Sequence, residues 1–292
     1  MMRRTAILTG AVYLFLAHAL FAQTKVDATG LAQLQNGLQS LAKDDCLVHA
    51  NWGFCLMDPA TGKIIASHEP EKSLTPASGM KAITTMVALN TLGTEYRYAT
   101  YLEIDGTLGA DSVLHGNLYI RGTGDPTLGS GRYDSVPKWP KLMEQWLAEI
   151  KKKGINHITG NIIADAGAFE DYAVPGSWNW DDIGQYYGAG PYGLNINENA
   201  YTIYYSSSTV SATIDSIVPE IEGLTVHSDV TVSGSSDNAF IYGAPDNYYR
   251  YVVGTIPAKR KAYSVNGSMP DPPLFPRVGI KESIDQCSCA GR

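Results

Sequence analysis

The segment that most constrains the fold is 78–93, SGMKAITTMVALNTLG, in which Lys81 is the only charged residue. Its pattern predicts a helix with apolar side chains on nearly every side, and Gly93 is a typical helix-ending residue. A helix of this kind is normally buried in the centre of a domain. Without the rest of such a domain, the helix would expose apolar surface.

Ser78 and Lys81 stand three positions apart at the beginning of this helix, after Pro76. Positions i and i+3 share one helix side, so the lysine amine can approach the serine hydroxyl. A serine becomes a nucleophile when a base takes its proton, and a lysine can act as that base when an apolar environment favours its neutral form. An N-cap serine beside a surface lysine gives the same sequence pattern, so the surrounding sequence has to distinguish a catalytic pair from this alternative.

The first 22 residues predict a secretory signal peptide. Arg3 and Arg4 precede an apolar run that ends at Leu20-Phe21-Ala22. The run is too short and wrongly flanked for a permanent membrane span, and no later stretch is long enough to cross a bilayer. We therefore expect an exported protein.

Four cysteines, Cys46, Cys55, Cys287 and Cys289, are the candidates for covalent or metal chemistry. In an exported protein Cys46 and Cys55 could form a disulfide, or both could be small buried residues. The other two lack companion ligands for zinc, and the histidines show no paired-ligand spacing, so we expect no metal or cofactor. The net charge of −7 argues against a nucleic-acid partner.

Periodicity predicts the elements before the serine. Leucines three and four positions apart indicate an amphipathic helix over 31–44. The turn residues of DPATGK (58–63) predict a β-hairpin formed by Phe54–Met57 and Lys63–Ser67.

Residues 99–265 alternate strand-like runs with glycine-rich turns, which predicts a β-rich inserted domain. One amphipathic helix is predicted within it, at 141–154. Asp181 and Asp182 suggest the polar start of a short helix. The triplet Ser236-Asp237-Asn238 has the chemistry of a β-turn between two strands.

Six segments carry a wider pattern: TPASGMKAITT (75–85), GNLYIRGTGDPTLGSG (116–131), ITGNIIADAGAF (158–169), GSWNWDDIGQYYGAGPYGLNINEN (176–199), GSSDNAFIYGAP (234–245) and VNGSMPDPPLF (265–275). Together they resemble the class C, low-molecular-mass penicillin-binding proteins, which are D-alanyl-D-alanine carboxypeptidases and endopeptidases of the penicillin-binding protein 4 type. The resemblance runs from about residue 30 to 275, and Trp178–Asn199 is its most distinctive part.

The resemblance implies an α+β fold, a β-lactamase/transpeptidase-like serine DD-peptidase domain interrupted by a large β-rich insertion. Its N-terminal part would be 23–98, the insertion 99–265 and the return segment 266–292. The implied activity is cleavage of peptidoglycan stem peptides in the periplasm through an acyl-enzyme, with Ser78 as nucleophile and Lys81 as base. β-Lactams would acylate the same serine.

The resemblance also assigns two substrate-binding residues. Asp165 matches an acidic position near the diaminopimelate side chain of the substrate, and Phe169 lies close by in the sequence. The alternative is that both are ordinary residues at the end of a strand.

Two further family motifs are expected, a Ser-x-Asn and a Lys-Thr-Gly strand, and Lys-Thr-Gly is absent from the sequence. Ser236-Asp237-Asn238 spells the first but falls inside the inserted region. After residue 275 the sequence departs from the family pattern, and Pro276 is expected to prevent a helix there. We therefore expect a truncated or frame-shifted chain, without the C-terminal half of the catalytic domain.

The alternative function is that of a catalytically inactive protein. Such a protein would bind peptidoglycan or a partner through the aromatic side chains of the β-rich region, namely Trp178, Trp180, Tyr186 and Tyr187.

Overall fold

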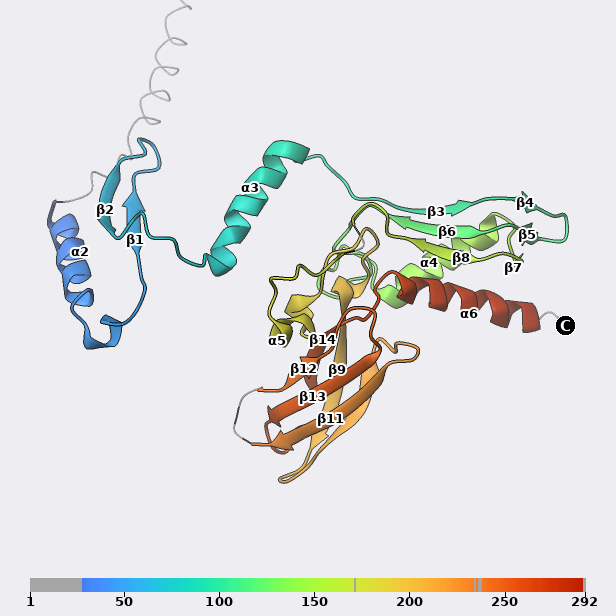
Figure 1. Cartoon of the computed structure of the whole chain (residues 1–292). Coiled ribbons are helices and arrows are strands. Elements are labelled where there is room, and N and C mark those ends of the chain that lie inside the picture. Colours follow the sequence, from blue (N-terminus) through green and yellow to red (C-terminus); the bar gives the residue numbers. More distant parts are fainter. Residues whose placement is uncertain (1–27, 171, 234, 236–237, 291–292) are drawn as a thin grey trace, which may run out of the picture. The chain divides into compact units, whose positions relative to one another are not determined.

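The computed structural model describes residues 28–170, 172–233, 235 and 238–290, with side chains in the last helix described as far as Ile284. The chain divides into two compact units, Met1–Glu95 and Tyr96–Arg292 (Figure 1). The predicted signal peptide and part of the Ser236-Asp237-Asn238 turn lie outside the described residues. The division into 23–98, 99–265 and 266–292 stays a prediction.

The N-terminal unit contains two helices and one hairpin among its described residues. They are α2 (Ala28–Leu41), the 3₁₀ turn η1 (Asp45–Leu47), β1 (Phe54–Met57), β2 (Ile64–His68), the 3₁₀ turn η2 (Ala77–Gly79) and α3 (Met80–Leu92). The two strands pair antiparallel, and α2 contacts β2. The predicted amphipathic helix begins and ends three residues earlier than expected, and the predicted hairpin is confirmed.

The α3 helix has no buried side chain, although it is apolar on most sides. Met86, for example, is 70% exposed, and the main contacts of α3 are with the preceding turn η2. The prediction of a buried helix is therefore wrong within this unit, because the small hairpin does not cover it. The expected exposure of apolar surface is confirmed there.

The first two cysteines neither form a disulfide nor are buried, so both alternatives predicted for them are wrong. Cys46 and Cys55 are both free thiols, and both are exposed. Cys46 lies in the turn η1 and Cys55 in β1, so the hairpin does not join them. The side chains of Cys287 and Cys289 lie outside the described residues.

The C-terminal unit is mostly β-structure, as the sequence predicts. Its strands form three-stranded sheets of order β3-β6-β8, β4-β5-β7, β10-β9-β14 and β11-β13-β12. Their bounds are β3 (Thr100–Ile104), β4 (Thr107–Leu108), β5 (Val113–His115), β6 (Leu118–Gly122), β7 (His157–Ile158), β8 (Ile162–Asp165), β9 (Ala200–Ser207), β10 (Ala212–Val218), β11 (Thr225–Val232), β12 (Phe240–Tyr242), β13 (Tyr249–Ile256) and β14 (Tyr263–Ser268).

Two long helices belong to the same unit. The α4 helix (Trp139–Lys152) confirms the predicted amphipathic helix, and α6 (Leu274–Ala290) contacts both α4 and β8. Pro276 lies in the first turn of α6, so the expectation that it prevents a helix is wrong. A first-turn N–H has no partner within the helix, and proline therefore costs little at that position.

Shorter helical segments lie between the sheets. They are α5 (Trp180–Ile183), η3 (Tyr186–Gly188) and η4 (Asn197–Asn199). Asp181 and Asp182 lie in the first turn of α5, which confirms the predicted polar helix start.

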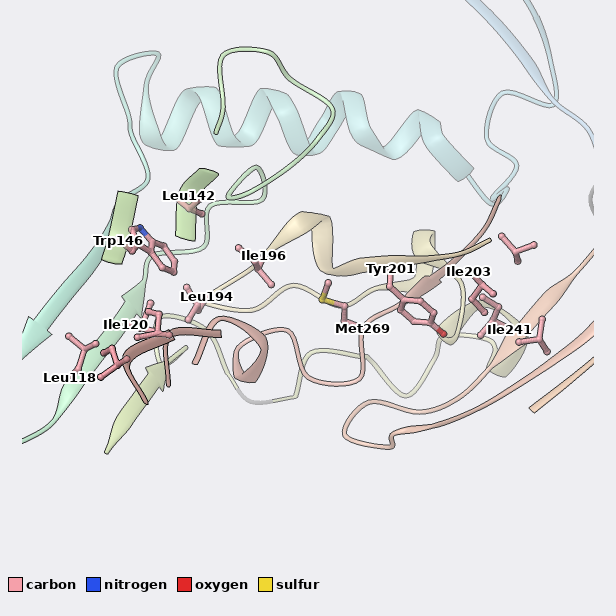
Figure 2. Packing of buried hydrophobic residues seen from close by; sticks show 14 of the residues in the cluster. Leu118, Ile120, Leu142, Trp146, Leu194, Ile196, Tyr201, Ile203, Ile241 and Met269 are labelled. Carbon is pink, nitrogen blue, oxygen red and sulfur yellow. The ribbon is translucent and has the colours of Figure 1, made fainter. Parts of the chain in front are cut away.

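One apolar cluster runs through the C-terminal unit. Leu118 and Ile120 of β6 meet Trp146 of α4 at one end, and Ile203 and Ile241 lie at the other (Figure 2). Burial of such side chains stabilises a fold by roughly 1.5–3 kcal/mol each. The sheets and both long helices therefore share one core.

Arg250 of β13 is almost completely buried within this unit. Its guanidinium donates hydrogen bonds to the backbone carbonyl oxygens of Ala244, Asn247, Tyr249 and Ser268. A planar guanidinium has several fixed donors, so one side chain can hold several chain segments together. Arg250 thus ties the turn between β12 and β13 to the end of β14.

Replacement of Ile120 tests the core. We expect Ile120→Ala, which deletes a fully buried side chain, to lower the free energy of unfolding of the C-terminal unit by about 2–5 kcal/mol. The matched control is Ile104→Ala in the neighbouring strand β3, where the side chain is 48% exposed, with an expected loss under about 1 kcal/mol. Urea-induced unfolding measures both, and equal losses would contradict the proposed core.

Candidate active site

Ser78 lies in the 3₁₀ turn η2, directly before α3. The Gly79 N–H donates to the Pro76 carbonyl oxygen at 2.9 Å, which closes this turn. Ala77 has a φ of +45°, in the left-handed region that alanine seldom adopts. The serine thus follows an unusual backbone conformation at the N-terminal end of an apolar helix.

Lys81 is the second residue of α3, and its amine reaches back to the serine. The Nζ atom donates a hydrogen bond to the Ser78 Oγ at 2.8 Å. Both side chains are exposed within the N-terminal unit. The distance is short enough for proton transfer between hydroxyl and amine, provided that the amine is neutral.

Asp165 is the last residue of β8, in the C-terminal unit. Its Oδ1 accepts a hydrogen bond from the Gly167 N–H at 2.9 Å. Arg121 of β6 occupies the paired register position. No hydrogen bond or ion pair joins the Asp165 carboxylate to another side chain among the described residues.

Arg121 forms an ion pair with Glu103 instead. Its Nη2 lies 2.6 Å from Glu103 Oε1, its Nε donates to Oε2 at 2.9 Å, and its guanidinium lies 4.4 Å from the centre of the Tyr101 ring. The hydrogen bonds from Arg121 lower the pKa of the Glu103 carboxyl. Because the Arg121 guanidinium is paired with Glu103, the Asp165 carboxylate can still accept hydrogen bonds from another cation.

Phe169 follows Asp165 by one tight turn, in which the Phe169 N–H donates to the Ala166 carbonyl oxygen at 3.2 Å. Its ring packs against Gly124, where a Cβ atom would stand 2.5 Å from the Phe169 Cζ. Gly124 also has a φ of +97°, which favours glycine. Phe169 is therefore a partly exposed ring supported from behind by a backbone without a side chain.

The structure brings Ser78 and Lys81 into contact, whereas Asp165 and Phe169 stand at the two ends of one tight turn. Ser78 and Lys81 belong to the N-terminal unit, and Asp165 and Phe169 belong to the C-terminal unit. Sequence reasoning missed the support from Arg121, Glu103 and Gly124. The opposite charges on neighbouring strands and the glycine pair in RGTGD (121–125) were the available signals.

Among the residues that the structure describes, no group of three or more His, Cys, Asp or Glu side chains is arranged to hold a metal ion. In the same part of the chain, no helix combines the length and apolar character needed to cross a bilayer.

Residues 34–286 match the sequence model of the D-Ala-D-Ala carboxypeptidase 3 (S13) family. The chain is 26% identical over 250 residues to a D-alanyl-D-alanine carboxypeptidase of an Actinomadura species, which covers 84% of this chain and 43% of the relative. It is 30% identical over 152 residues to the D-alanyl-D-alanine carboxypeptidase DacB of Haemophilus influenzae, which covers 52% of this chain and 29% of that one.

A solved structure shows the same fold. The crystal structure of penicillin binding protein 4 from Haemophilus influenzae superimposes with a TM-score of 0.62 at 21% identity, covering 80% of this chain and 50% of that one. The predicted DD-peptidase fold of mixed α and β content is thereby confirmed. The chain spans half or less of the length of these proteins, and the inserted domain and truncation stay predictions.

Replacement of Gly124 tests the support of Phe169. We expect Gly124→Ala to lower the melting temperature by at least about 2–4 °C, because alanine is strained at that φ and its Cβ would collide with the ring. Gly131→Ala is the control, since no atom lies within 4 Å of its added Cβ, and it should shift melting by less than about 1 °C. Equal melting temperatures for the two variants would contradict the packing.

Proposed function

The chain belongs to the D-Ala-D-Ala carboxypeptidase 3 (S13) family, and from this premise we propose that Ser78 is the nucleophile of a serine-type D-Ala-D-Ala peptidase. The observation that carries the proposal is the 2.8 Å contact between Lys81 Nζ and Ser78 Oγ. The proposed substrates are peptidoglycan stem peptides, cut at D-Ala-D-Ala or at a D-alanyl cross-link. The protein would act after export, in the periplasm.

The proposed chemistry proceeds in two steps. Neutral Lys81 takes the hydroxyl proton while the Ser78 Oγ attacks the D-alanyl carbonyl carbon. The C–N bond then breaks, the proton passes to the leaving amine, and an ester between serine and the D-alanyl residue is left. Water hydrolyses this ester and regenerates the serine. Backbone N–H groups at the start of α3 would stabilise the oxyanion.

β-Lactams would follow the same path as far as the ester. The Ser78 Oγ would attack the ring carbonyl, and the ring C–N bond would break. Because both parts stay joined in one molecule, the whole inhibitor would remain on the serine. Penicillin sensitivity is thus part of the proposal.

The neutral lysine is the demanding part of this chemistry. Burial away from water favours an uncharged amine, whereas the Lys81 amine is exposed within the N-terminal unit. We propose that bound substrate, by covering the amine, supplies the missing apolar environment. The exposed apolar surface of α3 supports this, because such surface is stable when covered.

Asp165 and Phe169 are proposed to bind the side chain of the substrate's third residue. The free acceptor oxygen of Asp165 suits the ammonium group of diaminopimelate, and the ring of Phe169 suits its methylene chain.

Labelling with fluorescent penicillin tests the nucleophile. We expect Ser78→Ala to abolish labelling of the folded protein, and Lys81→Met to reduce its rate by at least about 100-fold, because the base is lost. Ser73→Ala is the matched control, since Ser73 is also an exposed serine of the N-terminal unit, and its labelling should stay normal.

Labelling that persists in Ser78→Ala would overturn the assignment of the nucleophile. A folded native chain that takes up no label would instead support the alternative, a catalytically inactive protein that binds peptidoglycan or a partner.

Asp165→Asn tests the substrate pair. We expect the substitution to raise KM about tenfold or more for a stem peptide with diaminopimelate, because a charge-assisted hydrogen bond is lost. The rate of acylation by penicillin should stay unchanged. Asp134→Asn, at another exposed aspartate of the same unit, should change neither value. An equal KM increase for a peptide with alanine at the third position would contradict the role of Asp165.

A further inference from the structure

A second candidate site lies within the C-terminal unit, in a cleft of about 320 Å³. The cleft is lined by the loop 172–178, Ile183 of α5, Tyr192 and the turn Pro245–Asp246. Its volume is in the range of small-molecule sites in proteins. None of the residues proposed for peptide cleavage lines it.

Aromatic side chains form much of the wall. Tyr172 is 73% exposed and Trp178 is 38% exposed, so both rings keep apolar surface in contact with water. A turn holds Trp178, whose N–H donates to the Pro175 carbonyl oxygen at 3.0 Å. Exposed aromatic rings fixed along a cleft are typical of a binding surface, because a ligand can cover them at small entropic cost.

Two residues with polar side chains, Tyr192 and Asp246, line the same cleft. No hydrogen bond to the Tyr192 hydroxyl or to the Asp246 carboxylate occurs among the described residues. Burial, followed by the nearby carboxylates of Asp246 and Asp271, raises the pKa of Tyr192 to about 12. The phenol therefore keeps its proton at neutral pH and is available as a donor.

The backbone on both sides of the cleft is held in place. The Tyr192 N–H donates to Asn195 Oδ1 at 2.9 Å, and the Asp246 N–H donates to the Pro270 carbonyl oxygen at 2.8 Å. The buried Arg250 binds the carbonyl oxygens on either side of the Pro245–Asp246 turn. The polar pair is thus presented by fixed segments and needs little ordering on binding.

We propose that this cleft binds one sugar residue of a saccharide chain, with the apolar face of the sugar ring against Trp178. Sugar hydroxyls would donate to the Asp246 carboxylate and accept from the Tyr192 hydroxyl. The choice of sugar rests on the proposed function, which points to the amino sugars of the glycan strand that carries the stem peptides.

The polar pair favours a sugar over an organic ammonium ion. A cation would suit the aromatic wall and the carboxylate, but an ammonium group only donates hydrogen bonds and would leave the phenol without an acceptor. A sugar hydroxyl donates and accepts, so adjacent hydroxyls satisfy both groups.

Calorimetric titration of the full chain with chitotetraose, a peptide-free chain of N-acetylglucosamine, tests the proposal. We expect millimolar or tighter binding, weakened at least about tenfold by Trp178→Ala and about threefold to tenfold by Tyr192→Phe or Asp246→Asn. Trp180→Ala is the matched control, because Trp180 is an exposed tryptophan two residues away that does not line the cleft. It should leave the affinity within about twofold.

Absence of chitotetraose binding by the folded chain would overturn the proposal, as would equal losses in Trp178→Ala and Trp180→Ala. Tighter, Trp178-dependent binding of tetramethylammonium would overturn it in favour of a cation site. Chitotetraose contains no bond that Ser78 could cut, so Ser78→Ala should bind it normally. Failure here is thereby distinct from failure of the proposed peptidase activity.

Discussion

The C-terminal unit depends on one continuous apolar core, in which side chains from the sheets, α4 and α6 share a single interior. The N-terminal unit has nothing comparable. Among its described residues, Ala66 is the only buried apolar side chain. The free energy that holds the β-rich unit together therefore comes from within it, whereas α3 gains no such burial from its own unit.

This contrast bears directly on the proposed chemistry. The geometry of Ser78 and Lys81 is local, since one helical turn is enough to bring the amine to the hydroxyl. The uncharged state that the lysine needs is not local, because it depends on removing water from around the amine. The N-terminal unit thus provides the attacking group and its position. The amine also requires an apolar environment, and the apolar surface of α3 can form part of it once that surface is covered.

Local pattern was enough to predict several elements. The turn DPATGK (58–63) fixed the hairpin, and apolar spacing identified α4. Burial of α3 and the state of Cys46 and Cys55 could not be predicted in this way, because they depend on what packs against each segment. Pro276 was misinterpreted because proline has different effects inside a helix and in its first turn.

The candidate sites also differ in how far local sequence could predict them. Ser78 and Lys81 are neighbours in the sequence, and Asp165 and Phe169 were found through resemblance to a family. The support of Phe169 by Gly124 and the cleft that Tyr192 and Asp246 both line bring together residues far apart in the chain. No periodic pattern reports such contacts, so they became visible only in three dimensions.

The assignment of Ser78 as the nucleophile is tested by the mass of the intact chain after incubation with penicillin, followed by mapping of the modified peptide. We expect a single adduct with the full mass of the inhibitor, on Ser78. An unmodified folded chain, or an adduct on any other residue, would contradict it.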